Sequence, residues 1–132
     1  QTNGTVSLNF ESITGDYYIV VTHRNTVATS SSSLVSFVSG VATNFDFTTA
    51  DSQAYGDNQV MLETGIYGLF TGDLNQDGFI DVFDFPIYDI DNTDGKSGYY
   101  VTDINGDGFI DVFDFPIYDI NNLNAVSSYL PY

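Results

Sequence analysis

The chain has 132 residues, with 18 acidic residues against two formal cations, Arg24 and Lys96, and a net charge of −16. Because binding to phosphates needs a basic surface, this composition excludes nucleic acid and an anionic membrane as expected partners. The sequence has no cysteine, which excludes disulfides and cysteine–zinc sites. It also has no apolar run long enough to insert across a bilayer.

Residues 1–70 carry the alternating and apolar patterns of β-strands. Residues 17–22 (YYIVVT) are apolar almost throughout, which is typical of a central strand buried on both faces. Turns are expected at Gly15-Asp16, Arg24-Asn25, Ser39-Gly40 and Gly65. The expected strands are residues 5–10, 17–22, 34–38, 41–47, 59–62 and 66–70. They predict a small Ig-like β-sandwich with few strands, whose edge is open if the sandwich is incomplete.

Two short polar motifs interrupt this half. We expect Ser30, Ser31, Ser32 and Ser33 to form a solvated loop, with a glycan-bearing loop as the alternative. The triplet Asn3-Gly4-Thr5 fits the pattern for N-linked glycans, although three-residue patterns often match by chance.

The composition changes near residues 68–72, where acids, Gly and Asn replace Val, Thr and Ser. We therefore divide the chain into a β-sandwich at 1–70 and a second domain at 71–132. The second domain contains an 18-residue stretch that occurs twice, at residues 73–90 and 103–120. The two copies differ only where Leu74 matches Ile104 and Gln76 matches Gly106.

Oxygen-bearing residues alternate at the start of each copy, and we interpret them as calcium ligands. Numbered from the first Asp, positions 1, 3, 5, 9 and 12 offer side-chain oxygens and position 7 its carbonyl, which is the EF-hand pattern with Asp instead of Glu at position 12. Gly at position 6 permits a sharp bend with positive φ. The candidate ligands are Asp73, Asn75, Asp77, Phe79, Asp81 and Asp84 in loop 1 (residues 73–84), and Asp103, Asn105, Asp107, Phe109, Asp111 and Asp114 in loop 2 (residues 103–114).

Oxygen ligands without Cys or His favour a hard cation, and a flexible loop with six or more ligands favours Ca²⁺ over Mg²⁺. We expect two Ca²⁺ ions. The alternative, a merely acidic turn, would leave four carboxylates per loop in mutual repulsion.

A short helix is expected after each loop, because Pro86 and Pro116 are tolerated only in a first helical turn. Asp81 and Asp111 are the expected N-caps. Ile80 and Ile110 are expected to pair as strands between the two loops. The residues before each loop are poor helix formers, so the unit is a loop followed by a helix.

This duplicated loop–helix unit resembles the dockerin family over residues 72–122. The resemblance implies two calcium loops related by a pseudo-two-fold axis, and docking to cohesin modules of extracellular assemblies. The cohesin-reading residues usually include positions 10 and 11, which are Val82-Phe83 and Val112-Phe113 here.

A second resemblance covers more of the chain. YYIVVTHRN at residues 17–25, FDFTT at 45–49, QAYG at 53–56 and the repeats look like the C-terminal regions of large secreted surface proteins of the Bacteroidetes type. It implies an extracellular or cell-surface location. The start at Gln1 suggests a processed or excerpted chain, and a neighbouring subunit could supply missing strands and so build a filament.

Three functions compete on these grounds. The first is a calcium-stabilised structural protein that assembles with itself, and the second is a dockerin-type module that binds a cohesin-like receptor. The third is an enzyme, since many acids are compatible with a catalytic carboxylate pair. We expect no enzyme, because calcium accounts for most clustered acids and His23, the single histidine, has no accompanying nucleophile motif.

Overall fold

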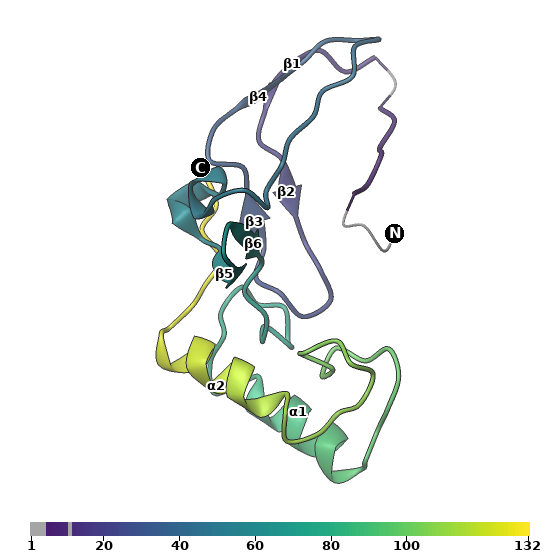
Figure 1. Ribbon diagram of the computed structural model, residues 1–132, viewed down its shortest axis with the longest axis vertical. Helices are drawn as coiled ribbons and strands as arrows, with labels where there is room; N and C mark the ends of the chain where they lie inside the picture. Colours follow the sequence, from purple (N-terminus) through teal and green to yellow (C-terminus); the bar gives the residue numbers. More distant parts are fainter. Residues whose placement is uncertain (1–4, 11) are drawn as a thin grey trace.

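The structure, a computed structural model that describes residues 5–10 and 12–132, has a mixed α+β fold. Two α-helices lie at one end of an elongated molecule and short strand pairs lie toward the other (Figure 1). The α+β class is therefore confirmed. No helix in the described ranges is long and apolar enough to cross a membrane. The Asn3-Gly4-Thr5 motif begins outside the described residues.

The strands form three separate two-stranded antiparallel sheets: β1 with β4, β2 with β3, and β5 with β6. Among the described residues no closed sandwich forms. Two short 3-10 helices, η1 (Asp51–Gln53) and η2 (Tyr55–Asp57), were not predicted. The strands are β1 (Gly15–Tyr17), β2 (Val20–Val21), β3 (Thr29–Ser30), β4 (Val35–Phe37), β5 (Val60–Glu63) and β6 (Ile66–Gly68).

Several predicted strands and turns are confirmed. The turns at Arg24-Asn25, at Ser39-Gly40 and at Gly65 are present. The strands expected at 34–38, 59–62 and 66–70 appear, slightly shifted or shortened, as β4, β5 and β6. Local turn chemistry and alternation were enough to locate them.

The buried central strand expected at residues 17–22 is wrong. The segment divides between β1 and β2, which pair with different partners, β4 and β3. Val20 is 49% exposed, so the apolar run does not mark a buried strand. The expected Gly15-Asp16 turn is also wrong, because both residues belong to β1.

Two other expected strands, at residues 5–10 and 41–47, do not form in this chain. Val6, Leu8 and Phe10 have the alternation of a strand but remain exposed. A strand needs the edge of a partner strand as well as its own pattern. In this structure β4 pairs with β1 and not with residues 5–10.

The prediction that Ser30–Ser33 form a solvated loop is wrong for its first two residues. Ser30 and Ser31 are fully buried, and Ser30 belongs to β3. The Ser31 hydroxyl accepts a hydrogen bond from the Ile19 N–H at 3.1 Å and donates one to the Ser33 carbonyl at 2.9 Å. Small hydroxyl side chains can therefore take the place of water for buried backbone groups.

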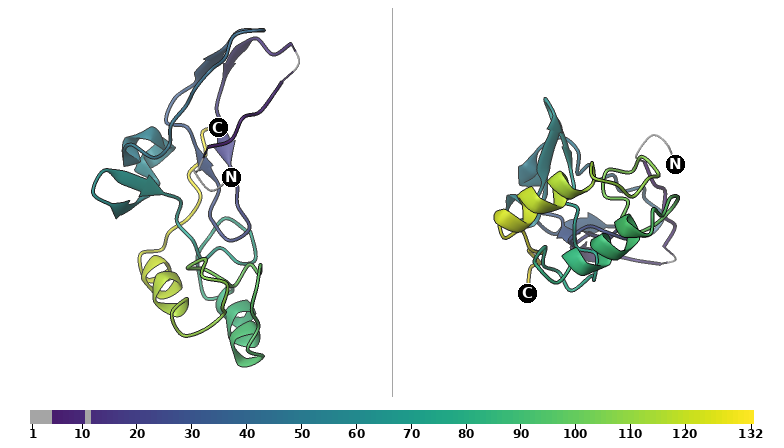
Figure 2. Two further views of the ribbon diagram at one scale, coloured as in Figure 1. Left: turned by 45° about the vertical axis from the view of Figure 1, so that its right-hand side comes forward. Right: turned by 90° about the horizontal axis from the view of Figure 1, so that it is seen from below.

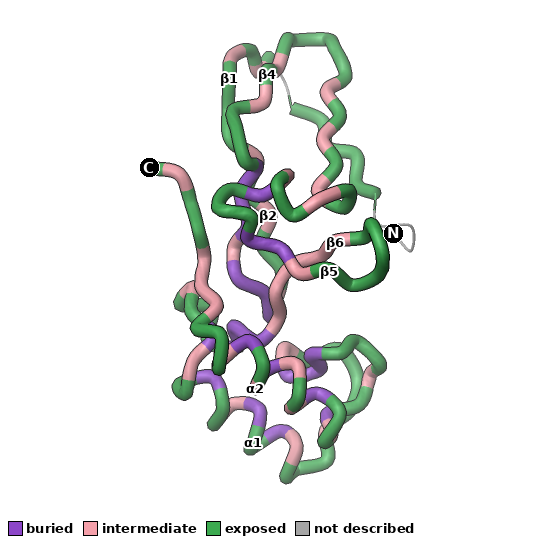
Figure 3. The backbone as a smooth tube through the Cα atoms, turned by 60° about the vertical axis from the view of Figure 1, so that its left-hand side comes forward, coloured by how far each residue is buried: buried purple, intermediate pink, exposed green. Residues whose placement is uncertain are grey.

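The hydrophobic core lies in the repeats rather than in the β-rich half. Buried residues concentrate toward the helical end, while the β1–β4 end is largely exposed (Figure 3). The buried cluster contains three matched pairs from the two copies and one residue from the first half: Leu74 and Ile104, Ile80 and Ile110, Tyr88 and Tyr118, and Val27. The core thus combines Val27 from before the expected boundary near residue 70 with six residues from after it. The division into two domains stays a prediction.

The helices α1 (Phe85–Thr93) and α2 (Phe115–Leu123) are short, as the prolines predict, with Pro86 and Pro116 in their first turns. The two helices lie near one another (Figure 2), with the rings of Phe85 and Phe115 at their starts in contact. Asp84 and Asp114, not Asp81 and Asp111, occupy the N-cap positions, so the predicted caps are wrong. The last four residues of each loop form a bend and a turn before the helix begins, with the Asp84 N–H donating to the Asp81 carbonyl and the Asp114 N–H to the Asp111 carbonyl.

Candidate metal centre

Both loops turn at position 6 as the sequence predicts. Gly78 has φ of 90° and Gly108 has φ of 88°, a conformation that side chains rarely tolerate. The two loops therefore share their sharpest bend.

The Asp at position 12 closes each loop from its centre. Asp84 is fully buried: its Oδ1 accepts the N–H groups of Leu74 at 2.7 Å and Asn75 at 3.1 Å, and its Oδ2 accepts that of Asp81 at 2.9 Å. Asp114 repeats this arrangement with Ile104, Asn105 and Asp111 at 2.7, 3.0 and 2.9 Å. One carboxylate thus joins the beginning, middle and end of its loop.

Positions 3 and 5 also hold the loop backbone. The Asn75 side-chain oxygen accepts the Asp77 N–H at 2.9 Å, and Asp77 accepts the Phe79 N–H at 3.0 Å. Asn105 and Asp107 do the same in loop 2. Polar oxygens therefore follow one another along each loop.

The structure brings only part of the predicted ligand set together. Asp73 lies close enough to Asp84 and Asp77 for their charges to act on it. Asp81 and Asp111 instead turn toward the N–H groups of Phe83 and Phe113. Over residues 5–10 and 12–132, no group of three or more His, Cys, Asp or Glu side chains is arranged to hold a metal. The twelve ligand assignments stay predictions.

Asp73 nevertheless has the property that a cation site requires. It is only 2% exposed, its Oδ2 accepts the Gly78 N–H at 3.1 Å, and its Oδ1 is buried without a hydrogen-bond partner. Burial raises the pKa of Asp73, as do the charges of Asp84 and Asp77, while the N–H groups of Gly78 and Gln76 oppose the rise. The Gln76 N–H does not reach Oδ1 with hydrogen-bond geometry. A buried carboxylate oxygen without a donor fits a hard cation.

Asp103, at the same position of loop 2, has both oxygens occupied. Its Oδ1 accepts the Gly106 N–H at 2.9 Å, and its Oδ2 accepts that of Gly108 at 3.2 Å. The Arg24 guanidinium also lies 3.4 Å from Oδ2. Arg24 comes from a turn of the first half, and sequence reasoning missed its role; the only signal was that it is the sole arginine in a strongly acidic chain.

Each loop is held by the segment that follows the other loop's helix. The Ile80 N–H donates to the Val126 carbonyl at 2.9 Å, and the Ile110 N–H to the Lys96 carbonyl at 3.2 Å. The strand-like pair predicted between Ile80 and Ile110 is therefore wrong, since each isoleucine pairs with a returning segment. The chain after α2 packs on loop 1 through residues 126–128, whereas Tyr129, Leu130 and Tyr132 remain exposed.

Two tyrosines complete the exchange between the copies. The Tyr88 hydroxyl donates to the Asp111 carbonyl and the Tyr118 hydroxyl to the Asp81 carbonyl, both at 2.8 Å. Their rings pack with Phe85 and Phe115, whose centroids are 5.9 Å apart. Each loop is thus positioned by the opposite copy.

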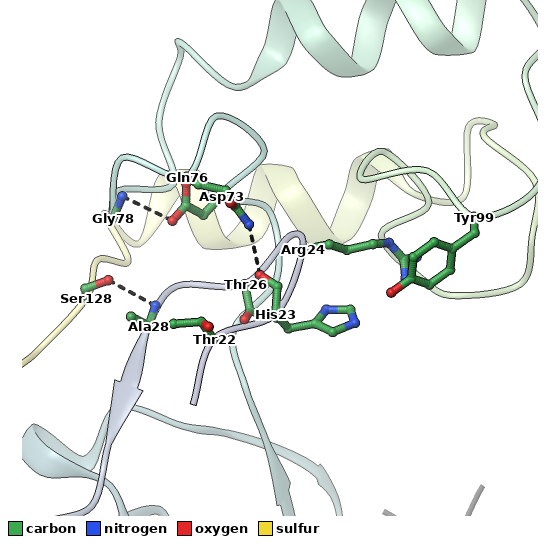
Figure 4. A pocket seen from close by; sticks show the side chains of 10 residues that line it. All are labelled: Thr22, His23, Arg24, Thr26, Ala28, Asp73, Gln76, Gly78, Tyr99 and Ser128. Atoms are coloured by element: carbon green, nitrogen blue, oxygen red, sulfur yellow. Dashed lines mark hydrogen bonds between the residues drawn. The ribbon is translucent and has the colours of Figure 1, made fainter. Parts of the chain in front are cut away.

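A hollow of about 550 Å³ lies between loop 1 and residues 22–28, which contain the Arg24-Asn25 turn (Figure 4). The Gln76 side chain spans it and donates to the His23 carbonyl at 3.1 Å. Two of the residues that line it, Asp73 and Thr26, carry the buried oxygens Asp73 Oδ1 and Thr26 Oγ1 that have no partner. Loop 1 is therefore bordered by unsatisfied polar atoms.

Comparison of this chain with protein-family models, with curated proteins and with solved structures finds no match. The residues and their geometry are the basis for a function.

Proposed function

We propose that this chain is a calcium-stabilised extracellular structural protein whose residues 71–132 form a dockerin-like pair of calcium sites. The observation that carries this proposal is Asp73 Oδ1, a buried carboxylate oxygen without a donor at position 1 of a loop with the calcium-binding pattern. Leaving such an oxygen unpaired costs free energy, which a bound cation would offset.

Two Ca²⁺ ions would be held by the oxygen-bearing residues of the loops. Calcium would supply positive charge to two loops that each carry four carboxylates, and would cancel four units of the net charge. The residues proposed to hold it are Asp73, Asn75, Asp77, Phe79, Asp81, Asp84, Asp103, Asn105, Asp107, Phe109, Asp111 and Asp114.

We further propose that the β-rich half is an incomplete sandwich that assembles with neighbouring copies by strand addition. Each sheet in the described part has only two strands, so β1 and β4 each pair on one side. Val6, Leu8 and Phe10 are 75%, 68% and 55% exposed, with the alternation of a strand. A second copy can offer the edge that these side chains need, and head-to-tail repetition would build a cell-surface filament.

Light scattering and electron microscopy of the purified chain with calcium test the assembly. We expect particles that grow with protein concentration, and strictly monomeric particles at every concentration would contradict it. Leu8→Asp should abolish growth because it places a charge on the apolar face. Ser7→Asp adds the same charge to the alternate position and serves as the matched control.

A second function, a dockerin-type module that binds a cohesin-like receptor, is favoured by one observation. Val82 and Phe83 are 64% and 70% exposed, and their equivalents Val112 and Phe113 are 67% and 69% exposed. Two matched apolar pairs on a charged surface are typical of a recognition surface. A pull-down with cohesin-like modules tests it, with Phe83→Asp and Phe113→Asp as the variants that should reduce capture.

We propose no catalytic role. His23 pairs with Asn25 inside its own turn, at 3.1 Å between Nδ1 and the amide oxygen. That contact accounts for the histidine as part of the turn.

A further inference from the structure

The two proposed calcium sites have nearly identical sequences but differ in one neighbouring charge. The Arg24 side chain donates to the Tyr100 carbonyl at 2.7 Å and to the Asp103 carbonyl at 3.0 Å, and its guanidinium lies 3.4 Å from Asp103 Oδ2. The Arg24 guanidinium carbon also lies 4.1 Å from the centre of the Tyr99 ring, which holds the side chain against the segment before loop 2. Arg24 is thus fixed beside position 1 of loop 2.

No cation among the described residues pairs with loop 1: Arg24 lines the same hollow as Asp73, but its ion pair is with Asp103. The contact of loop 1 with the same turn is neutral, from the Gln76 side chain to the His23 carbonyl. The only other formal cation in the sequence, Lys96, lies beyond the end of α1 and donates to Asp91 within that helix. The turn at residues 23–26 therefore offers a neutral contact to one loop and a positive charge to the other.

We propose that Arg24 makes loop 2 the weaker calcium site, so that the two loops fill in order, loop 1 first. This inference rests on the proposed calcium function. A guanidinium next to Asp103 neutralises part of the charge that attracts the ion and also repels the ion directly. Asp73 has no such counter-charge and retains a buried oxygen without a donor. A unit charge close to a divalent ion in a solvated site changes its affinity by about tenfold.

A calcium titration followed by NMR tests the order of filling in the unaltered chain. The amide signals of Gly78 and Gly108 report loops 1 and 2 separately, since each glycine lies at the bend of its own loop. We expect the Gly78 signal to complete its change at a calcium concentration about tenfold lower than Gly108. Simultaneous filling, or loop 2 filling first, would overturn the inference.

The variant Arg24→Gln should raise the affinity of loop 2 by about tenfold and leave loop 1 nearly unchanged. Lys96→Gln is the matched control, because it removes the same charge from a residue whose side chain contacts Asp91 instead of a loop. Arg24→Lys should keep loop 2 weak. Equal effects of Arg24→Gln and Lys96→Gln would contradict the assignment to Arg24. A chain in which neither glycine responds to calcium would instead contradict the calcium function itself.

Discussion

Loops 1 and 2 share most of their internal bonds but not their surroundings. In both, the Asp at position 12 binds three backbone N–H groups and a tyrosine from the other copy contacts position 9. Loop 1 borders residues 126–128, which also contact the first half: the Ala28 N–H donates to the Ser128 hydroxyl, and the Asn58 amide to the Ser127 carbonyl. Loop 2 borders residues 96–98 and Arg24.

This difference shows how a duplicated motif with the same candidate ligands in each copy can become inequivalent through its neighbours and through one loop residue, Gln76 in place of Gly106. Neighbours supplied by residues 1–70 distinguish the copies. Loop 1 is connected through the C-terminal segment to β3, since Thr29 and Tyr129 form a parallel bridge. The folding of the β-rich half should therefore depend more on loop 1 than on loop 2.

The largest expected effect comes from removing the carboxylate at position 12. Asp84→Ala and Asp114→Ala each leave three backbone N–H groups without their acceptor, which should cost about 3 kcal/mol or more of the free energy of unfolding. Each should also lose one calcium ion. Urea unfolding and calorimetry measure the two effects.

The two variants sharpen the comparison when their NMR spectra are set side by side. Asp84→Ala should shift the Ala28 amide and the Asn58 side-chain amide, because loop 1 holds the segment that both contact. Asp114→Ala should leave them in place. Asp84→Asn and Asp114→Asn, which keep one acceptor oxygen, serve as milder controls. Shifts of equal size from both alanine variants would break the proposed link between loop 1 and the first half.

A smaller and symmetric effect is expected from the tyrosine hydroxyls. Burial raises the pKa of Tyr88, with Asp114 and Asp111 adding to it, and burial likewise raises that of Tyr118. Both phenols therefore stay protonated and donate. Tyr88→Phe and Tyr118→Phe should each lower the free energy of unfolding by about 1 kcal/mol. Thermal unfolding measures this, and a clear inequality would show that the copies differ inside the core as well as around it.

The smallest effect concerns the ends of the two helices. Burial would raise the pKa of Asp91, but hydrogen bonds from Lys96 and Thr102 outweigh it and lower the pKa below the ordinary 3.8. Asp91 therefore contributes stability above about pH 4, and the contribution is lost as the pH falls through its folded-state pKa. The equivalent Asn121 donates to the Thr71 carbonyl at 2.7 Å and has no such dependence.

Asp91→Asn should therefore be less stable than the unaltered chain at about pH 6, and the difference should shrink at about pH 2. Urea unfolding of both proteins at the two pH values measures it. If the difference in free energy of unfolding were the same at both pH values, the ion pair between Lys96 and Asp91 would not contribute to stability.

Sequence reasoning located what is local and missed what depends on distant partners. The bends at Gly78 and Gly108 and the short helices at Pro86 and Pro116 follow from the conformations that Gly and Pro allow. Pairing of strands does not, because residues 5–10 have a strand's alternation and yet belong to no strand of the structure. The burial of Ser30 and Ser31 could not be predicted for the same reason, because it depends on distant partners and not on their polar side chains.

The candidate site divides in the same way. The spacing of the acids in the sequence predicted the two loops. That Asp73 Oδ1 is buried without a hydrogen-bond donor is known only from the structure. The position of Arg24, 79 residues before Asp103, has no local sequence pattern. Only the fold brings this charge to one copy and not the other.

The central claim is that the two copies are calcium sites, and counting bound ions tests it most directly. Native mass spectrometry of the chelated protein after addition of Ca²⁺ should show two ions per chain, and one ion each for Asp84→Ala and Asp114→Ala. A chain that binds no calcium, or two ions that both persist in each alanine variant, would contradict the account.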